Sequence, residues 1–258
     1  MTHTSTTVAT DETKTAAVVA ESKICLALEG LSLERACSLT SKLGMYCYAV
    51  KIHDLHDAEG PNAIRVLKKV GAKRVWVDAK LHDTPDTVAL RMRALTRNGA
   101  DIITVHASGG IKMMEAAAAA ALYAGGDILT EIWAITLLTS LGPTEIERDF
   151  GKYGRNPTAE QIVLNRALMA REGGLNGLVC SAKEVGMLSS HHDLQGMTFT
   201  VPGTRSAGVA LGQQKRSGTP AQAISDGATF IVASSQVVKA EHPVMAFKAM
   251  AAEVGMQI

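Results

Sequence analysis

The chain has 258 residues, of which 47% are hydrophobic and 20% are charged. This length and apolar content suffice for one large buried core, and single α/β barrels commonly have this size. The formal net charge is +1, with 26 Lys and Arg against 25 Asp and Glu. Such a balance gives no basic surface for nucleic acid or an anionic membrane, so we expect neither partner.

The chain lacks the sequence features of membrane, secreted and disulfide-rich proteins. No apolar run approaches the length that crosses a bilayer, and residues 1–20 lack the basic and apolar segments of a secretory signal. We expect this leader to be a mobile arm and residues 21–258 to form a single domain. Neither metal-ligand spacing nor a disulfide framework is found among the cysteines, which favours buried thiols in a reducing cytoplasm. They are Cys25, Cys37, Cys47 and Cys180.

Short β-rich runs alternate with helical segments along the rest of the chain. The predicted strands are Ile24–Leu28, Tyr46–Ile52, Val75–Ala79, Ile102–His106, Glu131–Leu137, Gly177–Cys180, Thr198–Val201 and Phe230–Ala233. The predicted helices are centred near Arg35, Val66, Met92, Ala117, Asn165, Glu184, Ala223 and Ala249, and prolines stand near several helix starts. Eight strands, each followed by a helix, predict a closed parallel (β/α)₈ TIM barrel. An open doubly wound sheet is the alternative, but Leu28–Leu31 is no Gly-rich phosphate fingerprint.

Two long connections follow predicted strands. Residues 141–158 are polar and Gly-rich, and we expect them to lie over the barrel mouth as a mobile segment. Residues 203–218 contain four glycines and are predicted to form a flexible lid.

Polar side chains come directly after most of the predicted strands, where barrel enzymes carry their chemistry. The densest group is in Val75–Pro85, where Asp78 and Lys80 are two residues apart and face the same way on an extended chain. With Lys51 and Asp83, they would form a set of two cations and two anions that hold one another ionised. A structural ion-pair network on the rim is the alternative interpretation.

This segment carries a family resemblance. Residues 78–84, Asp-Ala-Lys-Leu-His-Asp-Thr, match the D-x-K-x-x-D-[IT] signature of orotidine 5′-phosphate decarboxylases. The similarity to the bacterial form of this family extends from about Ile24 to the C-terminus. The other matching segments are residues 49–52, 104–110, 136–140, 177–182, 201–205, 214–216 and 219–220.

The resemblance implies an activity and a set of catalytic roles. Members of the family remove the C6 carboxylate of orotidylate to give uridylate, with no metal and no organic cofactor. Asp78 would lie beside the substrate carboxylate, where two anions raise the ground-state energy. Lys80 would stabilise the charge that develops at C6 and then donate a proton there. Lys51 would link the first-strand carboxylate to Asp78 and contact the ribose.

The resemblance also implies an assembly and a binding site. Asp83 in the family reaches into the partner's site, so a homodimer is expected. Thr139 would bind the pyrimidine edge, and Arg205 and Gln214 would close the lid on base and phosphate. The full set of expected substrate-binding residues is Glu29, Thr84, Thr139, Pro202, Arg205, Gln214, Ser234 and Ser235.

The histidines fit structural roles better than chemical ones. His106 ends a predicted strand but is expected to be a wall or packing residue, and His82 should point away from Lys80. Residues 191–193, His-His-Asp, are expected to form a solvated turn rather than a metal site.

Two positions depart from the family pattern. The first strand of the family ends in an aspartate, whereas this chain has Glu29, and displacements near ~1 Å can cost roughly 10²-fold in rate. The eighth strand of the family ends in Gly-Arg, which binds the phosphate. Here Ser234 and Ser235 replace the pair, and the lost charge-assisted contact is worth about 1.5–3 kcal/mol.

Three functions therefore stay open at the level of the sequence. The first is orotidylate decarboxylation with an altered phosphate pocket. The second is decarboxylation of a modified or non-phosphorylated pyrimidine nucleoside, which Ser235 favours and Arg205 disfavours. The third is a non-catalytic nucleotide-binding barrel, against which the intact charged set argues.

Overall fold

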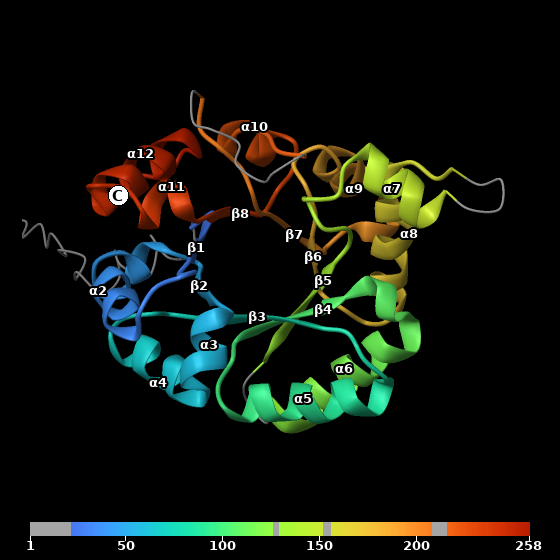
Figure 1. The fold of residues 1–258 in the computed structure, drawn as a ribbon, viewed down its shortest axis with the longest axis horizontal. Coiled ribbons are helices and arrows are strands. Elements are labelled where there is room, and N and C mark those ends of the chain that lie inside the picture. The colour runs from blue at the N-terminus through green and yellow to red at the C-terminus, as the bar shows by residue number, and fades with distance from the viewer. Residues whose placement is uncertain (1–21, 126–128, 152–155, 208–215) are drawn as a thin grey trace, which may run out of the picture.

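A ring of eight parallel strands forms the centre of the molecule (Figure 1). The computed structural model describes residues 22–125, 129–151, 156–207 and 216–258. Each strand pairs with the next along the chain, and the last pairs with the first, so the predicted (β/α)₈ barrel is confirmed. The strands are β1 Ile24–Ala27, β2 Ala49–Ile52, β3 Val75–Leu81, β4 Ile102–His106, β5 Glu131–Ile135, β6 Gly177–Val179, β7 Thr198–Val201 and β8 Phe230–Ala233.

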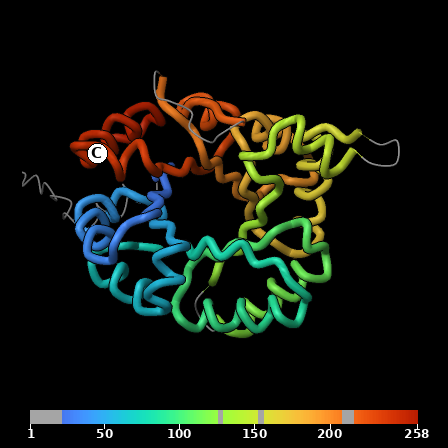
Figure 2. The backbone as a smooth tube through the Cα atoms, viewed as in Figure 1, coloured from blue at the N-terminus to red at the C-terminus, as the bar shows by residue number. Residues whose placement is uncertain are grey.

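Helices surround the barrel (Figure 2). Those that follow the strands are α2 Leu33–Leu43, α4 Pro61–Lys69, α5 Pro85–Arg97, α6 Ile111–Gly125, α8 Ala159–Glu172, α9 Val185–Ser190, α10 Pro220–Ser225 and α12 Pro243–Glu253. Shorter elements occupy connections: α3 Asp54–Glu59, α7 Pro143–Phe150, α11 Ser235–Val238, and the 3₁₀ turns η1 Gly44–Tyr46, η2 Ala107–Gly109 and η3 His192–Leu194. The first helical turns of α4, α5, α7, α10 and α12 each carry a proline, where its missing N–H is no loss.

Several connections differ from the sequence prediction, and the short helix α3 is one that was not predicted. The second strand begins at Ala49 rather than Tyr46, because residues 44–46 close a 3₁₀ turn first. The connection after β5 contains α7, which the polar composition did not predict. This helix begins at Pro143, and the Glu145 side chain accepts a hydrogen bond from the Gly142 amide at 2.9 Å.

The barrel interior is closed at the amino ends of the strands by aromatic side chains. The ring of Tyr48 stacks on Phe230 with centroids 3.9 Å apart, and Trp76 meets Trp133 edge-on at 4.8 Å. The Tyr48 hydroxyl and the Trp133 indole both donate to the Glu131 carboxylate. Because aromatic side chains fill the barrel at the amino ends of the strands, the open end of the barrel is at their carboxyl ends.

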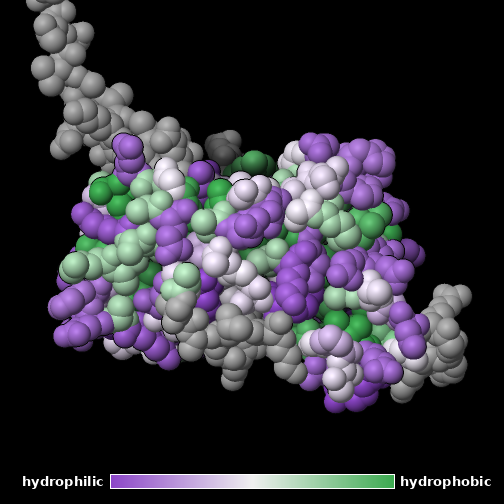
Figure 3. All heavy atoms as spheres, turned by 90° about the horizontal axis from the view of Figure 1, so that it is seen from above, coloured by the Kyte–Doolittle hydropathy of each residue, from purple (hydrophilic) through white to green (hydrophobic). Residues whose placement is uncertain are grey.

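On the face shown in Figure 3, hydrophilic residues are interspersed with smaller hydrophobic areas. Within the described ranges, no helix has the length and apolar character needed to span a bilayer.

The close approach of β6 to Trp133 gives a stability prediction. A Cβ atom at Gly177 would lie 2.2 Å from Cδ1 of the fully buried Trp133. We expect Gly177→Ala to lower the free energy of unfolding by about 1–3 kcal/mol, because the core would be overpacked. Urea unfolding followed by circular dichroism measures this.

The control is Gly186→Ala in α9, where the new Cβ would lie 3.7 Å from the nearest atom. It should leave stability unchanged or raise it by up to about 1 kcal/mol, since alanine favours the helix. Equal effects of the two substitutions would contradict the packing argument.

Candidate active site

Three adjacent strands bring a set of charged side chains together at the open end of the barrel. Lys51 is paired with Trp76 in the β2–β3 register, and its Nζ lies 3.0 Å from Oδ2 of Asp78. The same ammonium group donates to Oε1 of Glu29, which follows β1. The Nζ of Lys80 lies 2.6 Å from the same Oδ2 of Asp78. The Asp78 carboxylate is therefore shared by two ammonium groups.

A threonine from the fourth strand holds the other side of this carboxylate. The Thr104 hydroxyl donates to Oδ1 of Asp78 at 2.7 Å and accepts a hydrogen bond from the Lys80 amide at 3.0 Å. Thr104 is completely buried. Its hydroxyl thus couples the position of Asp78 to the backbone of Lys80.

Lys80 has an unusual backbone conformation. Its φ of +44° is the one positive value at a non-glycine residue across the described ranges. The β3–β4 register shifts between Val77 and Leu81, so Lys80 stands in a bulge. Conformations of this kind cost on the order of 1–3 kcal/mol and are found at functional sites. The bulge allows Lys80 to reach back to Asp78.

The charges set the protonation state of the buried groups. Burial alone would raise the pKa of Asp78, but Lys51 and Lys80 outweigh it and hold the pKa at about 2. Burial alone would lower the pKa of Lys51, but Asp78 and Glu29 raise it above its ordinary value. The pKa of Glu29 is well below its usual range because it accepts a hydrogen bond from His53 and faces Lys51. At neutral pH, both carboxylates are ionised and Lys51 is protonated.

These groups form one side of a cavity of about 640 Å³ at the barrel mouth. A cavity of this size is within the range that holds small organic ligands. Trp76, Ile135, Val179 and Val232 contribute apolar side chains from the strands. The polar and charged lining residues are Glu29, Lys51, Asp78, Lys80, Thr139, Arg205, Ser234, Ser235 and Lys239.

The rim opposite Lys80 is built from the residues after β7 and β8. Arg205 Nη2 donates to the Ser235 hydroxyl at 3.4 Å, and the Ser234 hydroxyl donates to Oε2 of Glu29 at 3.4 Å. The Gln236 amide donates to the Ser206 hydroxyl at 2.6 Å. These contacts connect the predicted lid to the end of β8.

Among the residues predicted to form the site, most of those that the structure describes line this cavity, and two do not. Asp83 and Thr84 lie in the exposed loop between β3 and α5, outside the cavity lining. The Asp83 carboxylate accepts from the Thr84 amide at 2.7 Å and contacts neither lysine. Gln214 lies outside the described residues, as do residues 1–21. Pro202 lines the cavity together with Thr139 and Arg205.

The histidines noted in the sequence are absent from the lining of this cavity. His82 and His106 face each other with ring centroids 5.6 Å apart. Burial, with the neighbouring His82 and Lys80, lowers the pKa of His106.

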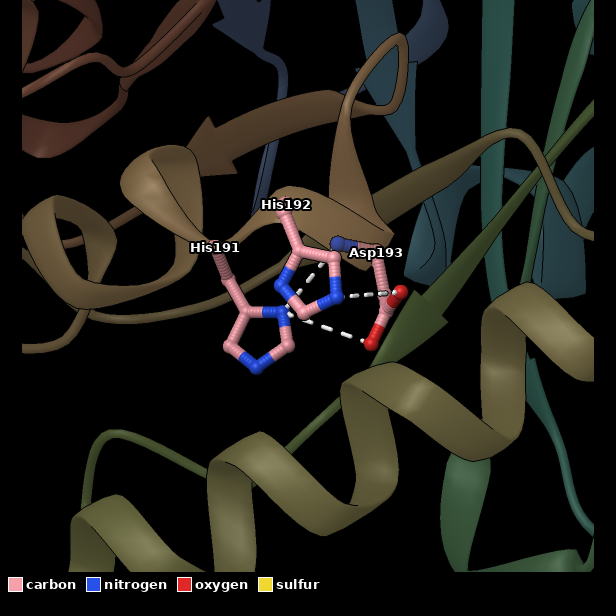
Figure 4. Close-up of side chains that lie close together, drawn as sticks. All are labelled: His191, His192 and Asp193. Atoms are coloured by element: carbon pink, nitrogen blue, oxygen red, sulfur yellow. Dashed lines mark hydrogen bonds and ion pairs between the residues drawn. The ribbon is translucent and has the colours of Figure 1, made fainter.

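The His-His-Asp turn lies on η3, before the amino end of β7 (Figure 4). The His192 and Asp193 side chains point toward each other, with Nε2 2.9 Å from Oδ1, and the His191 ring stacks on His192. The three side chains together offer possible metal ligands. However, the Asp193 amide donates to Nδ1 of His191 at 3.3 Å, and the His192 side chain is 86% exposed.

Three residues of the site were missed in the sequence. Thr104 and His53 contact the carboxylates directly, and Lys239 lines the cavity rim. His53 is two residues after Lys51 and so would face the same way on an extended chain, and Lys239 is one helical turn after Ser235. The spacing of each residue therefore gave a weak indication that it belongs to the site.

Comparisons with known proteins agree with this geometry. Residues 22–250 match the model of the orotidine 5′-phosphate decarboxylase / HUMPS family. The orotidine 5′-phosphate decarboxylase of Moorella thermoacetica is 37% identical over 243 residues, which cover 92% of this chain and 94% of the relative. That of Sphingopyxis alaskensis is 38% identical over 226 residues, covering 87% and 96%.

A solved structure has the same architecture. The crystal structure of orotidine 5′-phosphate decarboxylase from Lactobacillus acidophilus matches with a TM-score of 0.75 at 28% sequence identity. The match covers 90% of this chain and 99% of that one. With the family model spanning most of the chain and relatives above one-third identity, this protein belongs to the orotidine 5′-phosphate decarboxylase / HUMPS family.

Proposed function

We propose that the chain decarboxylates orotidine 5′-monophosphate to uridine 5′-monophosphate in de novo pyrimidine biosynthesis, without a cofactor. The observation that carries the proposal is the 2.6 Å contact between Lys80 Nζ and Asp78 Oδ2 at the wall of the mouth cavity. An ionised carboxylate and an ammonium group side by side provide both a repulsive and an attractive partner for a reacting carboxylate. The names of the relatives support the same chemistry.

These two side chains supply the negative charge and the proton that the reaction uses. The substrate carboxylate lies against Asp78, and like charge at short distance raises the ground-state energy. The C–C bond at C6 breaks, CO₂ leaves, and the electron pair stays on C6. The Lys80 ammonium stabilises this pair electrostatically and transfers a proton to C6. Solvent then reprotonates the neutral amine, and the site returns to its starting charge.

Lys239 supports a substrate that carries a 5′-phosphate. It follows α11 and lines the cavity with Arg205 and with Ser235, the residue that stands where the family has its phosphate-binding arginine. A lysine at this rim supplies the positive charge that Ser235 lacks, although without bidentate geometry. Ser235 itself favours the second candidate, a decarboxylase of a non-phosphorylated pyrimidine nucleoside.

The position of Asp83 supports a homodimer. The carboxylate lies beyond the end of β3, exposed and outside the cavity of its own chain. We propose that it enters the site of a second copy, with isologous contacts at the barrel mouth.

The proton-donor role of Lys80 is tested by substitution. We expect Lys80→Ala to abolish decarboxylation, so that the ultraviolet absorbance of the orotate ring no longer decreases with time. The circular dichroism spectrum should stay unchanged. The control is Lys112→Ala on the exposed side of α6, which should keep full turnover. Retained decarboxylation in Lys80→Ala would remove Lys80 from the proton-donor role.

The 5′-substituent is tested by comparing orotidylate with orotidine. We expect a higher kcat/KM for orotidylate, and we expect Lys239→Gln to lower that value roughly tenfold or more while orotidine turnover stays constant. The reason is the loss of a charge-assisted contact worth about 1.5–3 kcal/mol. Ser235→Arg should raise kcat/KM for orotidylate. A wild-type preference for orotidine would favour the nucleoside enzyme instead.

The low pKa of Asp78 predicts a pH effect on stability. A carboxyl group whose pKa is lowered on folding stabilises the fold above its unfolded pKa, and this stabilisation is lost as the pH falls through the folded pKa. For Asp78 these values are 3.8 and about 2, so a contribution on the order of 2 kcal/mol should disappear between about pH 4 and pH 2. Urea unfolding at several pH values should show a smaller acid loss in Asp78→Asn. Identical acid profiles would contradict the pairing.

A further inference from the structure

A histidine outside the predicted site holds the Glu29 carboxylate. His53 follows β2 directly, and its Nε2 lies 3.3 Å from Oε1 of Glu29. That same oxygen accepts from the Lys51 ammonium group. His53 therefore contacts Glu29, and only through Glu29 is it connected to Lys51 and Asp78.

The backbone of α3 determines which ring nitrogen carries the proton. The Asp54 amide donates to Nδ1 of His53 at 2.6 Å, and Oδ1 of Asp54 lies 3.0 Å from the same nitrogen. The shorter contact is a hydrogen bond from the backbone amide, and we infer from it that Nδ1 is an acceptor. In a neutral imidazole the proton must then be on Nε2. This is the nitrogen that faces Glu29, so the ring donates a hydrogen bond to the carboxylate.

A second bond closes the arrangement. Oδ2 of Asp54 accepts from the Gly30 amide at 2.9 Å, and Gly30 directly follows Glu29. The loop after β1 and the start of α3 are thus joined twice, once through the backbone of Gly30 and once through the Glu29 side chain. The two bonds fix the direction from which the carboxylate approaches Lys51.

Glu29 needs such a support because it is long and partly exposed. Its side chain is 36% exposed, and it has one more rotatable bond than an aspartate at the same place. The bond from His53 is the largest influence that lowers its pKa, ahead of the charge of Lys51. His53 also lines a second cavity of about 230 Å³.

We propose that His53 is a positioning residue, which donates from Nε2 to Glu29 and so holds the longer carboxylate against Lys51. The inference rests on the proposed decarboxylation for its effect on rate, but not for its geometry. It explains how a chain with glutamate at the end of β1 keeps the Lys51–Asp78 contact in place.

Activity measurements separate positioning from simple packing. We expect His53→Leu to lower kcat for orotidylate roughly tenfold or more, with a smaller change in KM, since small displacements of reacting groups are costly. His53→Gln should restore much of the rate, because its amide nitrogen is also a donor. The matched control is His192→Leu on η3, which should keep wild-type kinetics.

A double-mutant cycle tests the route through Glu29. Glu29→Asp draws the carboxylate away from His53, so His53→Leu should cost little more in that background than Glu29→Asp alone. Fully additive losses would overturn the proposal, because His53 would then act independently of Glu29. Wild-type rates in His53→Leu would overturn it as well.

Spectroscopy tests the geometry without any substrate. Nitrogen-15 spectra of wild-type protein should show His53 protonated at Nε2, and carbon-13 titration should show the pKa of Glu29 rising in His53→Gln and further in His53→Leu. A proton on Nδ1 would overturn the His53 inference whatever the variants do. An inactive wild type with the proton on Nε2 would instead refute the proposed reaction.

Discussion

The Asp78 carboxylate is the group around which the mouth of this barrel is organised. A buried carboxylate costs several kcal/mol unless charges and hydrogen bonds compensate it. Here Lys51 and Lys80 share one oxygen and the Thr104 hydroxyl holds the other. Because these partners come from β2, β3 and β4, the charge is compensated only when three neighbouring strands are in register. The site and the closed barrel therefore depend on each other.

The backbone next to this carboxylate has a conformation that is unfavourable for a non-glycine residue. Lys80 has a φ of +44° inside a bulge, which an extended strand would avoid. Its amide is held by Thr104, the residue that also holds Asp78. The side chain consequently returns to the cavity instead of following the strand toward α5. Lower in the barrel, the aromatic side chains around Trp133 pack tightly and carry no such strain.

Local pattern was sufficient to predict the eight strands and the pairing of Asp78 with Lys80, because both depend on alternation within a short segment. The same reasoning placed Asp83 with them, yet β3 ends at Leu81 and the Asp83 side chain lies outside the cavity. Thr104 and His53 were missed because their roles arise from register between strands and from side-chain rotamers. The helix α7 was missed because its residues are mostly polar and only Ile146 is buried.

The two departures from the family pattern meet at one carboxylate. β1 and β8 are the strands whose pairing closes the barrel, with Leu26 opposite Ala233. Glu29 follows the first of them and Ser234 the second, and the Ser234 hydroxyl donates to Oε2 of Glu29 at 3.4 Å. With His53 and Lys51 on Oε1, both oxygens of this longer side chain have partners. A serine at the end of β8 and a glutamate at the end of β1 thus form one connected arrangement, and a change at either position alters the environment of the other.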